Sequence, residues 1–158
     1  VSTTVRVKLH SLTNRKADLL AREYEAFQTA VHGGDADLYS ATDQQAPKVQ
    51  RQKDPTPDTE QPVVLRNDVF DVAQNEDTVL SSWWVNVPVY DPERGRGNSI
   101  WCPAHVPQKD EQLVREGDIR NSELVRRDGD WYVHLVVKQS VTVADGYDDV
   151  LAIDMGAR

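Results

Sequence analysis

The stretch "ELVRRDGDWYVHLVV", Glu123 to Val137, carries the strongest structural signal in this chain of 158 residues. Asp128-Gly129 is typical of the two-residue turn of a β-hairpin, whose central positions both need a positive φ. After the turn, apolar and polar side chains alternate, which predicts one apolar face that begins with Trp131 and one polar face that begins with Tyr132. We therefore expect two antiparallel strands, at residues 123–127 and 131–143.

Other segments of the chain show the same strand patterns, with turn signals between them. They are residues 3–9, 63–72, 78–89 and 98–106. The first alternates Val5, Val7 and Leu9 with charged side chains, as a half-buried strand does. The last two are separated by the turn-rich "YDPERGRG", residues 90–97. About six strands, mostly antiparallel, predict a mainly β chain with a small barrel that hides its edges.

A helical insertion interrupts this β pattern. Leu20, Tyr24, Phe27 and Val31 recur at helical spacing, between a capping residue at position 13 or 14 and a Gly-Gly stop. A shorter helix is expected at residues 35–41, as is helical structure between residues 109 and 116. Residues 42–62 are rich in Gln, Asp and Pro with almost no apolar anchors, and they predict a mobile linker. The domain map is therefore a β domain of residues 1–10 and 61–149, interrupted by a helical insertion and linker at residues 11–60.

The amino-acid composition bears on the partners of the protein and on its environment. The net charge of -8 argues against a nucleic-acid partner, because Lys and Arg carry phosphate binding. The acids are 18 Asp and 8 Glu, and the bases are 12 Arg and 6 Lys, a balance that we expect of a protein adapted to high salt, where surface repulsion is screened. An acidic interaction face is the alternative. The single cysteine and the absence of an apolar run long enough for a membrane favour a soluble, cytoplasmic protein.

The last nine residues, "VLAIDMGAR", form a second signal of chemical interest. Val150, Leu151 and Ile153 predict a buried strand that presents Asp154 at its tip, and residues 150–158 would open a second domain. Asp154 has three interpretations. It caps a tight turn, it is the first Mg²⁺ ligand of an RNase H-like nuclease, or it opens a nucleotide-binding domain like that of the actin-like ATPases.

The order of motifs distinguishes between these interpretations. An initial strand, a helical excursion, "LRNDVFDV", "WWVNVPVYDPERG", "ELVRRDGDWYVHLVVKQSV" and then "VLAIDMGAR" resemble the TnpB family of RNA-guided nucleases, also described as transposases of small insertion sequences. The similarity spans nearly the whole chain and is most specific in "RRDGDWYVHLVV" with the Asp-x-Gly strand after it.

The resemblance implies a wedge-type β-barrel, interrupted by a helical recognition lobe and followed by the first strand of a RuvC-like nuclease domain. Asp154 would be the first catalytic carboxylate and a Mg²⁺ ligand, with the remaining carboxylates outside this sequence. The chain would then be an amino-terminal fragment that binds guide RNA and target DNA, takes up no cofactor and cleaves nothing by itself. The alternative is a stand-alone nucleic-acid-binding or regulatory module without nuclease activity.

A set of basic and aromatic residues is the candidate nucleic-acid surface. Its members are Arg15, Lys16, Arg126, Arg127 and Tyr132. Cations reach phosphates and a tyrosine ring stacks on bases, so this mixture is typical of nucleic-acid binding. The alternative is an ordinary hairpin with charged shoulders. We expect Trp83, Trp84 and Trp101 to belong to the core, because they lie in apolar strand segments.

Overall fold

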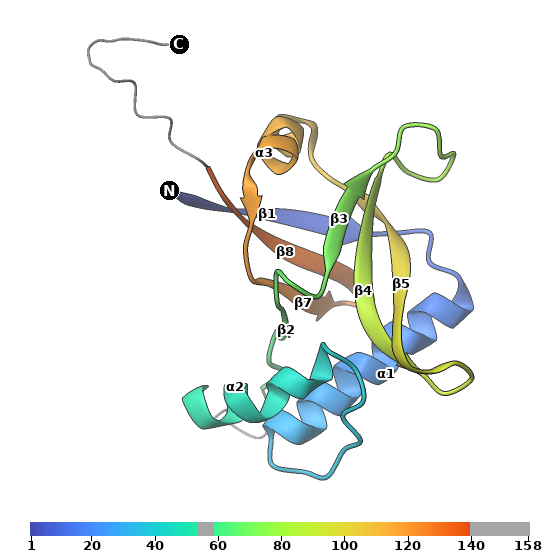
Figure 1. Cartoon of the computed structure of the whole chain (residues 1–158), viewed down its shortest axis with the longest axis vertical. Helices are drawn as coiled ribbons and strands as arrows, with labels where there is room; N and C mark the ends of the chain where they lie inside the picture. Colours follow the sequence, from blue (N-terminus) through green and yellow to red (C-terminus); the bar gives the residue numbers. More distant parts are fainter. Residues whose placement is uncertain (54–58, 140–158) are drawn as a thin grey trace.

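The chain folds around one antiparallel sheet that curls into a half-barrel (Figure 1). In this computed structural model the described residues are 1–53 and 59–139. The strands are β1 (Ser2–Leu9), β2 (Val63–Leu65), β3 (Asp71–Gln74), β4 (Trp83–Asp91), β5 (Gly95–His105), β6 (Asp118–Ile119), β7 (Ser122–Arg127) and β8 (Asp130–Lys138). The helices are α1 (Asn14–Val31), α2 (Ala46–Lys53) and α3 (Glu111–Glu116), with 3-10 turns η1 (Asp43–Gln45) and η2 (Gln108–Asp110). The expectation of a mainly β chain with mostly antiparallel strands and a helical insertion is confirmed.

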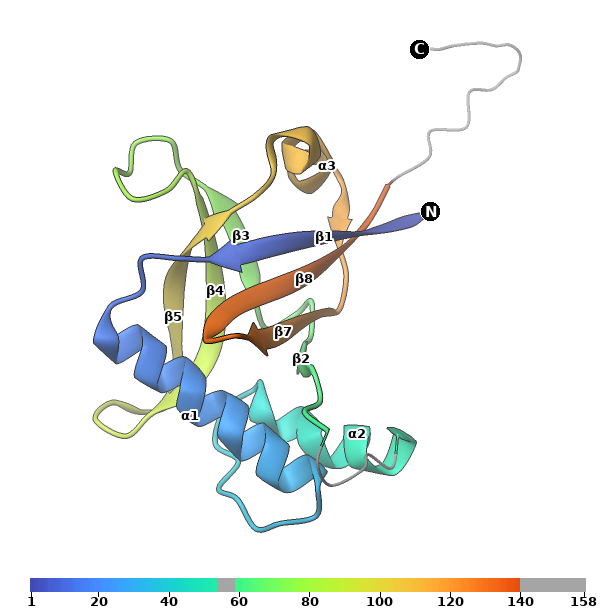
Figure 2. The ribbon, with the colours of Figure 1, turned by 180° about the vertical axis from the view of Figure 1, so that it is seen from behind.

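The strand order is β2-β7-β8-β1-β5-β4-β3, with the short β6 paired to the end of β8. Strand β1 joins the two halves of the sheet, since it pairs along its whole length with β8 and at Lys8 and Leu9 with β5. Figure 2 shows β1, β8 and β7 as one wall, and Figure 1 shows β3, β4 and β5 as the other. The edge strands β2 and β3 do not pair with each other, so the sheet stays open where the sequence predicted a barrel with hidden edges.

The hairpin predicted at Asp128-Gly129 is confirmed. Asp128 has a φ of 52° and Gly129 a φ of 83°, the left-handed values that this turn needs. The register places Leu124 opposite Val133 and Arg126 opposite Trp131. The two predicted faces of β8 are also confirmed, because buried and partly exposed residues alternate along the strand.

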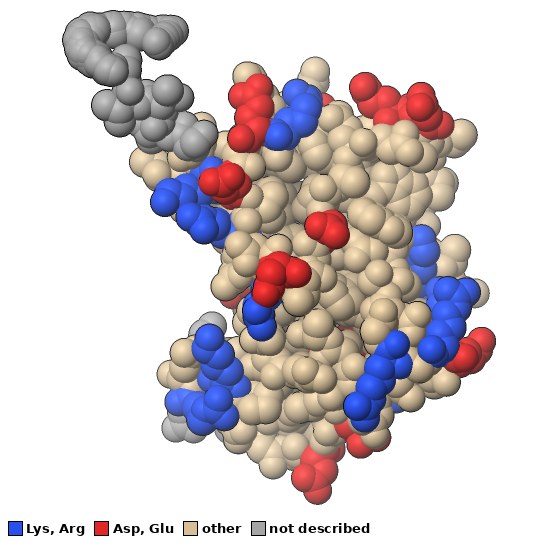
Figure 3. Space-filling view, in the orientation of Figure 1, with Lys and Arg blue, Asp and Glu red and all other residues tan. Residues whose placement is uncertain are grey.

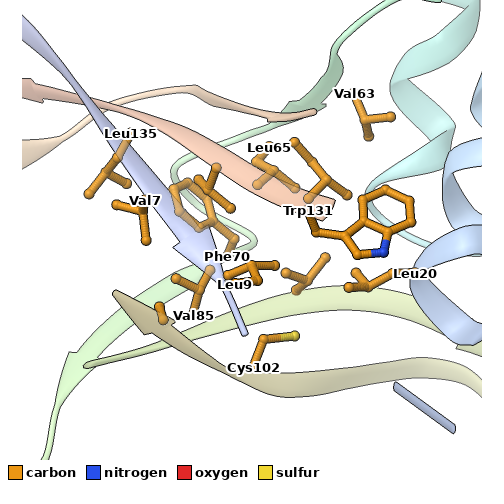
Figure 4. Close-up of a cluster of buried hydrophobic side chains, with 14 of the residues drawn as sticks. Val7, Leu9, Leu20, Val63, Leu65, Phe70, Val85, Cys102, Trp131 and Leu135 are labelled. Atoms are coloured by element: carbon orange, nitrogen blue, oxygen red, sulfur yellow. The ribbon is translucent and has the colours of Figure 1, made fainter. Parts of the chain in front are cut away.

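The core lies between the two walls, and α1 packs across the open end of the half-barrel (Figures 1 and 4). The inward residues of β1 (Val5, Val7, Leu9) are at most 3% exposed, as alternation predicts. The apolar stripe of α1 is buried as expected, and the ring of Tyr24 meets that of Trp131 edge-on at a centroid distance of 5.2 Å. Each fully buried side chain of this size stabilises the fold by about 1.5–3 kcal/mol.

The expectation for residues 63–72 as one extended segment is wrong. Val63–Leu65 pairs with β7, whereas Asp71–Gln74 pairs with β4 at the other edge of the sheet. A turn at residues 66–70 separates them, closed by hydrogen bonds from the amides of Val69 and Phe70 to the carbonyl of Arg66. Similarly, residues 78–82 form a loop, and β4 begins only at Trp83. The polar pair Asn67-Asp68 favours such a turn.

The prediction of an unanchored linker is wrong for residues 42–53. These residues form η1 and α2, with Thr42, Asp43, Ala46 and Val49 buried. The short helix expected at residues 35–41 is absent, while the one expected near residues 109–116 is present as η2 and α3. Pro47 is tolerated because it lies in the first turn of α2, where a backbone donor is not needed. The anchors at Thr42 and Asp43 are polar, so a search for apolar residues could not find them.

Candidate nucleic-acid interface

The five basic and aromatic candidates fall on three separate parts of the fold. Arg127 and Tyr132 point outward from the wall of β7, β8 and β1, Arg15 and Lys16 lie in the first turn of α1, and Arg126 lies at the contact between that wall and α1. Asp154 and the expected strand at residues 150–158 lie outside the described residues. The candidates therefore do not form one site.

The first part is an outer patch, which we define as Arg6, Lys8, Arg127, Tyr132 and His134. Antiparallel pairing brings these side chains together, since Lys8 is opposite Tyr132 and Arg6 is opposite His134. The guanidinium of Arg6 lies 4.3 Å from the centre of the Tyr132 ring, a cation–π contact. Figure 2 shows no helix in front of these three strands. The outer patch thus offers cations and an aromatic ring on a sheet face that no helix of the described residues covers.

The cations of the outer patch are only weakly neutralised. Lys8 lies 3.6 Å from Asp130, but both side chains are about half exposed (47% and 51%). Exposed pairs of this kind contribute about 0–1 kcal/mol, so water or a phosphate can replace the carboxylate. Within residues 1–53 and 59–139, no carboxylate lies at ion-pair distance from Arg6 or Arg127.

His134 contributes an imidazole ring to the outer patch, and this ring is uncharged at neutral pH. Burial lowers the pKa of His134 below its usual value of 6.5, and the nearby cations Arg127 and Arg6 lower it further, against an opposing effect of Glu123. The patch is therefore basic through Arg6, Lys8 and Arg127 rather than through the histidine.

The guanidinium of Arg126 is engaged in ion pairs and cation–π contacts within the protein. It lies 3.0 Å from a carboxylate oxygen of Glu25 and 3.1 Å from one of Glu60. The same group lies over the rings of Tyr24, at 4.6 Å, and Trp131, at 5.8 Å. Because successive strand residues point to opposite faces, Arg126 and Arg127 cannot act as one phosphate-binding pair.

The hydroxyl of Tyr24 donates a 2.8 Å hydrogen bond to Glu60. We refer to Arg126, Glu25, Glu60 and Tyr24 together as the clamp. Burial, followed by the hydrogen bond to Glu60 and its negative charge, raises the pKa of Tyr24 to about 12. The pKa of Glu60 is lowered, first by the hydrogen bond from Tyr24 and also by Arg126. The clamp joins α1 and β7 to the residues that lead into β2, and it has a structural role.

The first turn of α1 forms the third part. Arg15 pairs with the buried carboxylate of Asp91, while the amine of Lys16 donates to the carbonyl of Trp101 and lies 5.5 Å from the centre of the Trp84 ring. This turn contains no acidic residue, although acids are favoured there by the helix dipole. In Figure 3, Lys and Arg side chains lie beside the start of α1 and over α2, and Asp and Glu side chains are scattered over the part of the face above them.

The tryptophans differ from the expectation that all three lie in the core. Trp83 is 4% exposed and is in the core, but Trp101 is 42% exposed. Its neighbours Ile100 and Cys102 point inward, so strict alternation along β5 sends Trp101 outward. That alternation was available in the sequence and identifies Trp101 as a surface aromatic beside Lys16.

The described part of the chain offers no candidate for a metal site or for a reactive thiol. No group of three or more His, Cys, Asp or Glu side chains in these residues is arranged to hold a metal ion. Burial raises the pKa of Cys102 to about 12, so its thiol is a poor nucleophile.

No helix among the described residues is long and apolar enough to cross a membrane.

Comparison with known proteins adds no family. No protein-family model matches the chain, and no curated protein matches it. The functional assignment therefore depends on the motifs of the sequence and on the geometry of the surface.

Proposed function

We propose that this chain is the nucleic-acid-binding, amino-terminal part of an RNA-guided DNA endonuclease of the TnpB type. In this proposal the half-barrel is the wedge domain, α1 and α2 form the helical recognition lobe, and residues 150–158 begin a RuvC-like domain. The protein would act in the cytoplasm, on guide RNA and target DNA, during transposition.

The observation that carries the proposal is the outer patch. Arg6 lies over the ring of Tyr132, and Lys8 and Arg127 lie on the same sheet face, which no helix of the described residues covers. Cations supply the backbone contacts that give most of the affinity for nucleic acids, and an aromatic ring allows a base to stack. The acidic residues, among them Glu123 and Asp130 on the same sheet face, do not prevent this, because binding depends on the local potential and three cations, Arg6, Lys8 and Arg127, outnumber them there.

The first turn of α1 is a second, smaller contact in this proposal. The amine of Lys16 donates to the backbone carbonyl of Trp101 and faces the ring of Trp84, while the Trp101 side chain is exposed, so that one phosphate and one stacked base could be held at neighbouring residues there. Arg126 is withdrawn from the set of binding residues, because its guanidinium is already engaged by Glu25 and Glu60.

The catalytic step belongs to the full-length protein. Asp154 would hold Mg²⁺ together with carboxylates from beyond this sequence, since Mg²⁺ requires several oxygen ligands. The metal would stabilise charge on the scissile phosphate. A stand-alone binding or regulatory module remains the second candidate, because the outer patch by itself does not require a nuclease. A reading frame that continues past Arg158 into further carboxylates and paired CxxC motifs would support the nuclease.

The binding function is tested with the 158-residue chain, a structured RNA hairpin and a DNA duplex, at several KCl concentrations. The double change Arg6→Ala with Arg127→Ala should reduce the slope of log affinity against log salt by about two, roughly 0.9 per phosphate contact on B-DNA. Arg66→Ala with Arg115→Ala removes the same charge from two exposed arginines away from the outer patch and should leave the slope unchanged. Equal slopes for both double variants, or no binding by the wild type, would reject the proposal.

A further inference from the structure

Four buried polar residues form a junction between the helices and the sheet. Glu23 of α1 is 1% exposed, Ser40 is 3%, Thr42 is 0% and Asp43 of η1 is 1%. The junction meets the end of β4 at Pro88 and Tyr90. Charged residues are almost never buried this completely without a partner of opposite charge, so the chemistry of the junction has to be explained.

Hydrogen bonds connect the junction to three elements. One carboxyl oxygen of Glu23 accepts from the hydroxyl of Ser40 at 2.6 Å, and the other accepts from the amide of Tyr90 at 2.7 Å. The Ser40 oxygen accepts in turn from the amides of Thr42 (3.1 Å) and Asp43 (3.0 Å). Thr42 donates its hydroxyl to the carbonyl of Pro88 at 2.7 Å. The segment before α2 is therefore attached both to α1 and to β4.

No cation neutralises the two carboxyl groups. In the described residues, neither Glu23 nor Asp43 takes part in an ion pair. The nearby cations face aromatic rings instead: Arg22 lies 5.1 Å from the centre of the Tyr90 ring, and Arg96 lies 4.4 Å from that of Tyr39. Those two rings meet edge-on at 4.8 Å.

The remaining charged neighbours are also engaged elsewhere. Asp91, which follows Tyr90, is paired with Arg15 and Arg94. Among the described residues, the charged group that acts on Glu23 from nearby is the carboxyl of Asp43. The junction thus contains two carboxyl groups and no compensating positive charge.

Two buried carboxylates in contact cannot both be ionised at low cost, because each is desolvated and each repels the other. Burial is the main cause that raises the pKa of Glu23 to about 8, and the charge and hydrogen bond of Asp43 raise it further, against the bonds from Ser40 and Tyr90. Burial raises the pKa of Asp43 as well, while the hydrogen bond from Glu23 lowers it. We therefore expect Glu23 to keep its proton at neutral pH and to share it with Asp43.

We propose that this junction is a proton-dependent latch, which holds the segment of η1 and α2 against α1 and β4 while Glu23 is protonated and releases it when both carboxyl groups are ionised. The latch depends on the fold alone and is independent of the proposed nucleic-acid function. Its consequence is that the helical excursion opens separately from the sheet in alkaline solution.

The direction of the pH dependence follows from the proton count. The folded state holds a proton on Glu23 that the unfolded or opened state releases near its ordinary pKa of 4.5. Stability is therefore complete below about 4.5 and is lost as the pH rises toward about 8. Between pH 6 and pH 9 the opening equilibrium of the segment should increase on the order of tenfold or more.

The test is backbone hydrogen exchange of the full 158-residue chain at pH 6, 7.5 and 9, with each rate divided by the intrinsic exchange rate at that pH. In the wild type, protection of the amides of residues 40–53 should fall on the order of tenfold or more from pH 6 to pH 9. The amides at the centre of β8 should fall less, because they report opening of the sheet.

Glu23→Gln is the decisive variant. Glutamine keeps an acceptor for Tyr90 and has a donor for Asp43, loses the oxygen that accepts from Ser40, and cannot ionise, so protection of residues 40–53 should no longer depend on pH. Asp43→Asn removes the repelling charge but leaves the buried Glu23 able to ionise, so it should reduce the pH dependence without abolishing it, and it is the second variant if Glu23→Gln does not fold. Asp18→Asn, an exposed acid on the same helix, is the matched control and should behave as the wild type. Protection that is independent of pH in the wild type, or an unchanged pH dependence in Glu23→Gln and Asp43→Asn, would overturn the proposal.

Discussion

Arg126 and Arg127 are neighbours in the chain, yet they point to opposite faces of β7. Arg126 lies over the ring of Tyr24 and pairs with Glu25 and Glu60, whereas Arg127 lies on the outer face opposite Asp130 and has no ion pair within the described residues. The two residues form a natural pair for experiments, because the same substitution removes a structural contact in one case and a surface charge in the other.

Arg126→Ala should destabilise the fold by about 1–2 kcal/mol, as the sum of a partly desolvated cation–π contact and two partly exposed ion pairs. Arg127→Ala should change the free energy of unfolding by no more than about 0.5 kcal/mol, as is usual for surface changes. Urea denaturation of the two variants at equal salt measures the difference. Equal losses would mean that the clamp around Tyr24 contributes little.

The sequence predicted the features that depend on near neighbours. The Asp128-Gly129 hairpin, the alternation along β8 and the apolar stripe of α1 follow from local chemistry and were found as expected. The buried position of Glu23 could not be predicted, because its partners Ser40, Asp43 and Tyr90 come from three separate places in the chain. For the same reason the sequence did not predict that Thr42 and Asp43 attach η1 and α2 to the fold. It also could not show that Arg126 is engaged in ion pairs while Arg127 lies on the outer face.

Trp101→Ala should weaken binding of single-stranded nucleic acid while leaving the fold intact. Stacking of one base on an aromatic ring contributes about 1–3 kcal/mol, so the affinity should fall roughly five- to hundredfold. Trp101→Phe, which keeps a ring, should recover most of this loss. Trp83→Ala is the structural comparison and should cost about 3–5 kcal/mol of stability, because that side chain is 4% exposed. Affinity that is unaffected by Trp101→Ala would remove this residue from the interface.

The charge of the outer patch should not depend on pH between 7 and 8. The pKa of His134 lies below 6.5 through burial and the neighbouring Arg127 and Arg6, so the ring is neutral there. Because the folded pKa is depressed for a base, the stability associated with His134 is present above 6.5 and is lost as the pH falls from 6.5 through the lower folded pKa. An NMR titration of the imidazole measures the value directly. Arg6→Ala with Arg127→Ala should raise it, and a value above 6.5 in the wild type would contradict the assignment.

The acidic surface should make the fold dependent on salt. With 26 acids against 18 bases, self-repulsion disfavours the compact state when the screening length is long. Thermal unfolding in dilute buffer should therefore occur at a lower temperature than in molar KCl. Matched experiments in molar KCl and in sucrose separate screening of charge from general exclusion of solutes. The same melting temperature in dilute buffer and in KCl would show that the charge balance has another cause.

Asp154→Ala tests the proposed connection to a nuclease. In the full-length protein this change should abolish Mg²⁺-dependent cleavage of DNA and leave guide and target binding nearly intact. The reason is that a carboxylate at the tip of a strand holds the metal, whereas affinity comes from cations such as Arg6 and Arg127. In the 158-residue chain the same change should alter neither stability nor binding, because a single carboxylate cannot hold Mg²⁺ against its hydration shell. A loss of more than ~1 kcal/mol there would instead assign Asp154 to a turn cap. Continued cleavage by the full-length variant would exclude this strand from the catalytic centre.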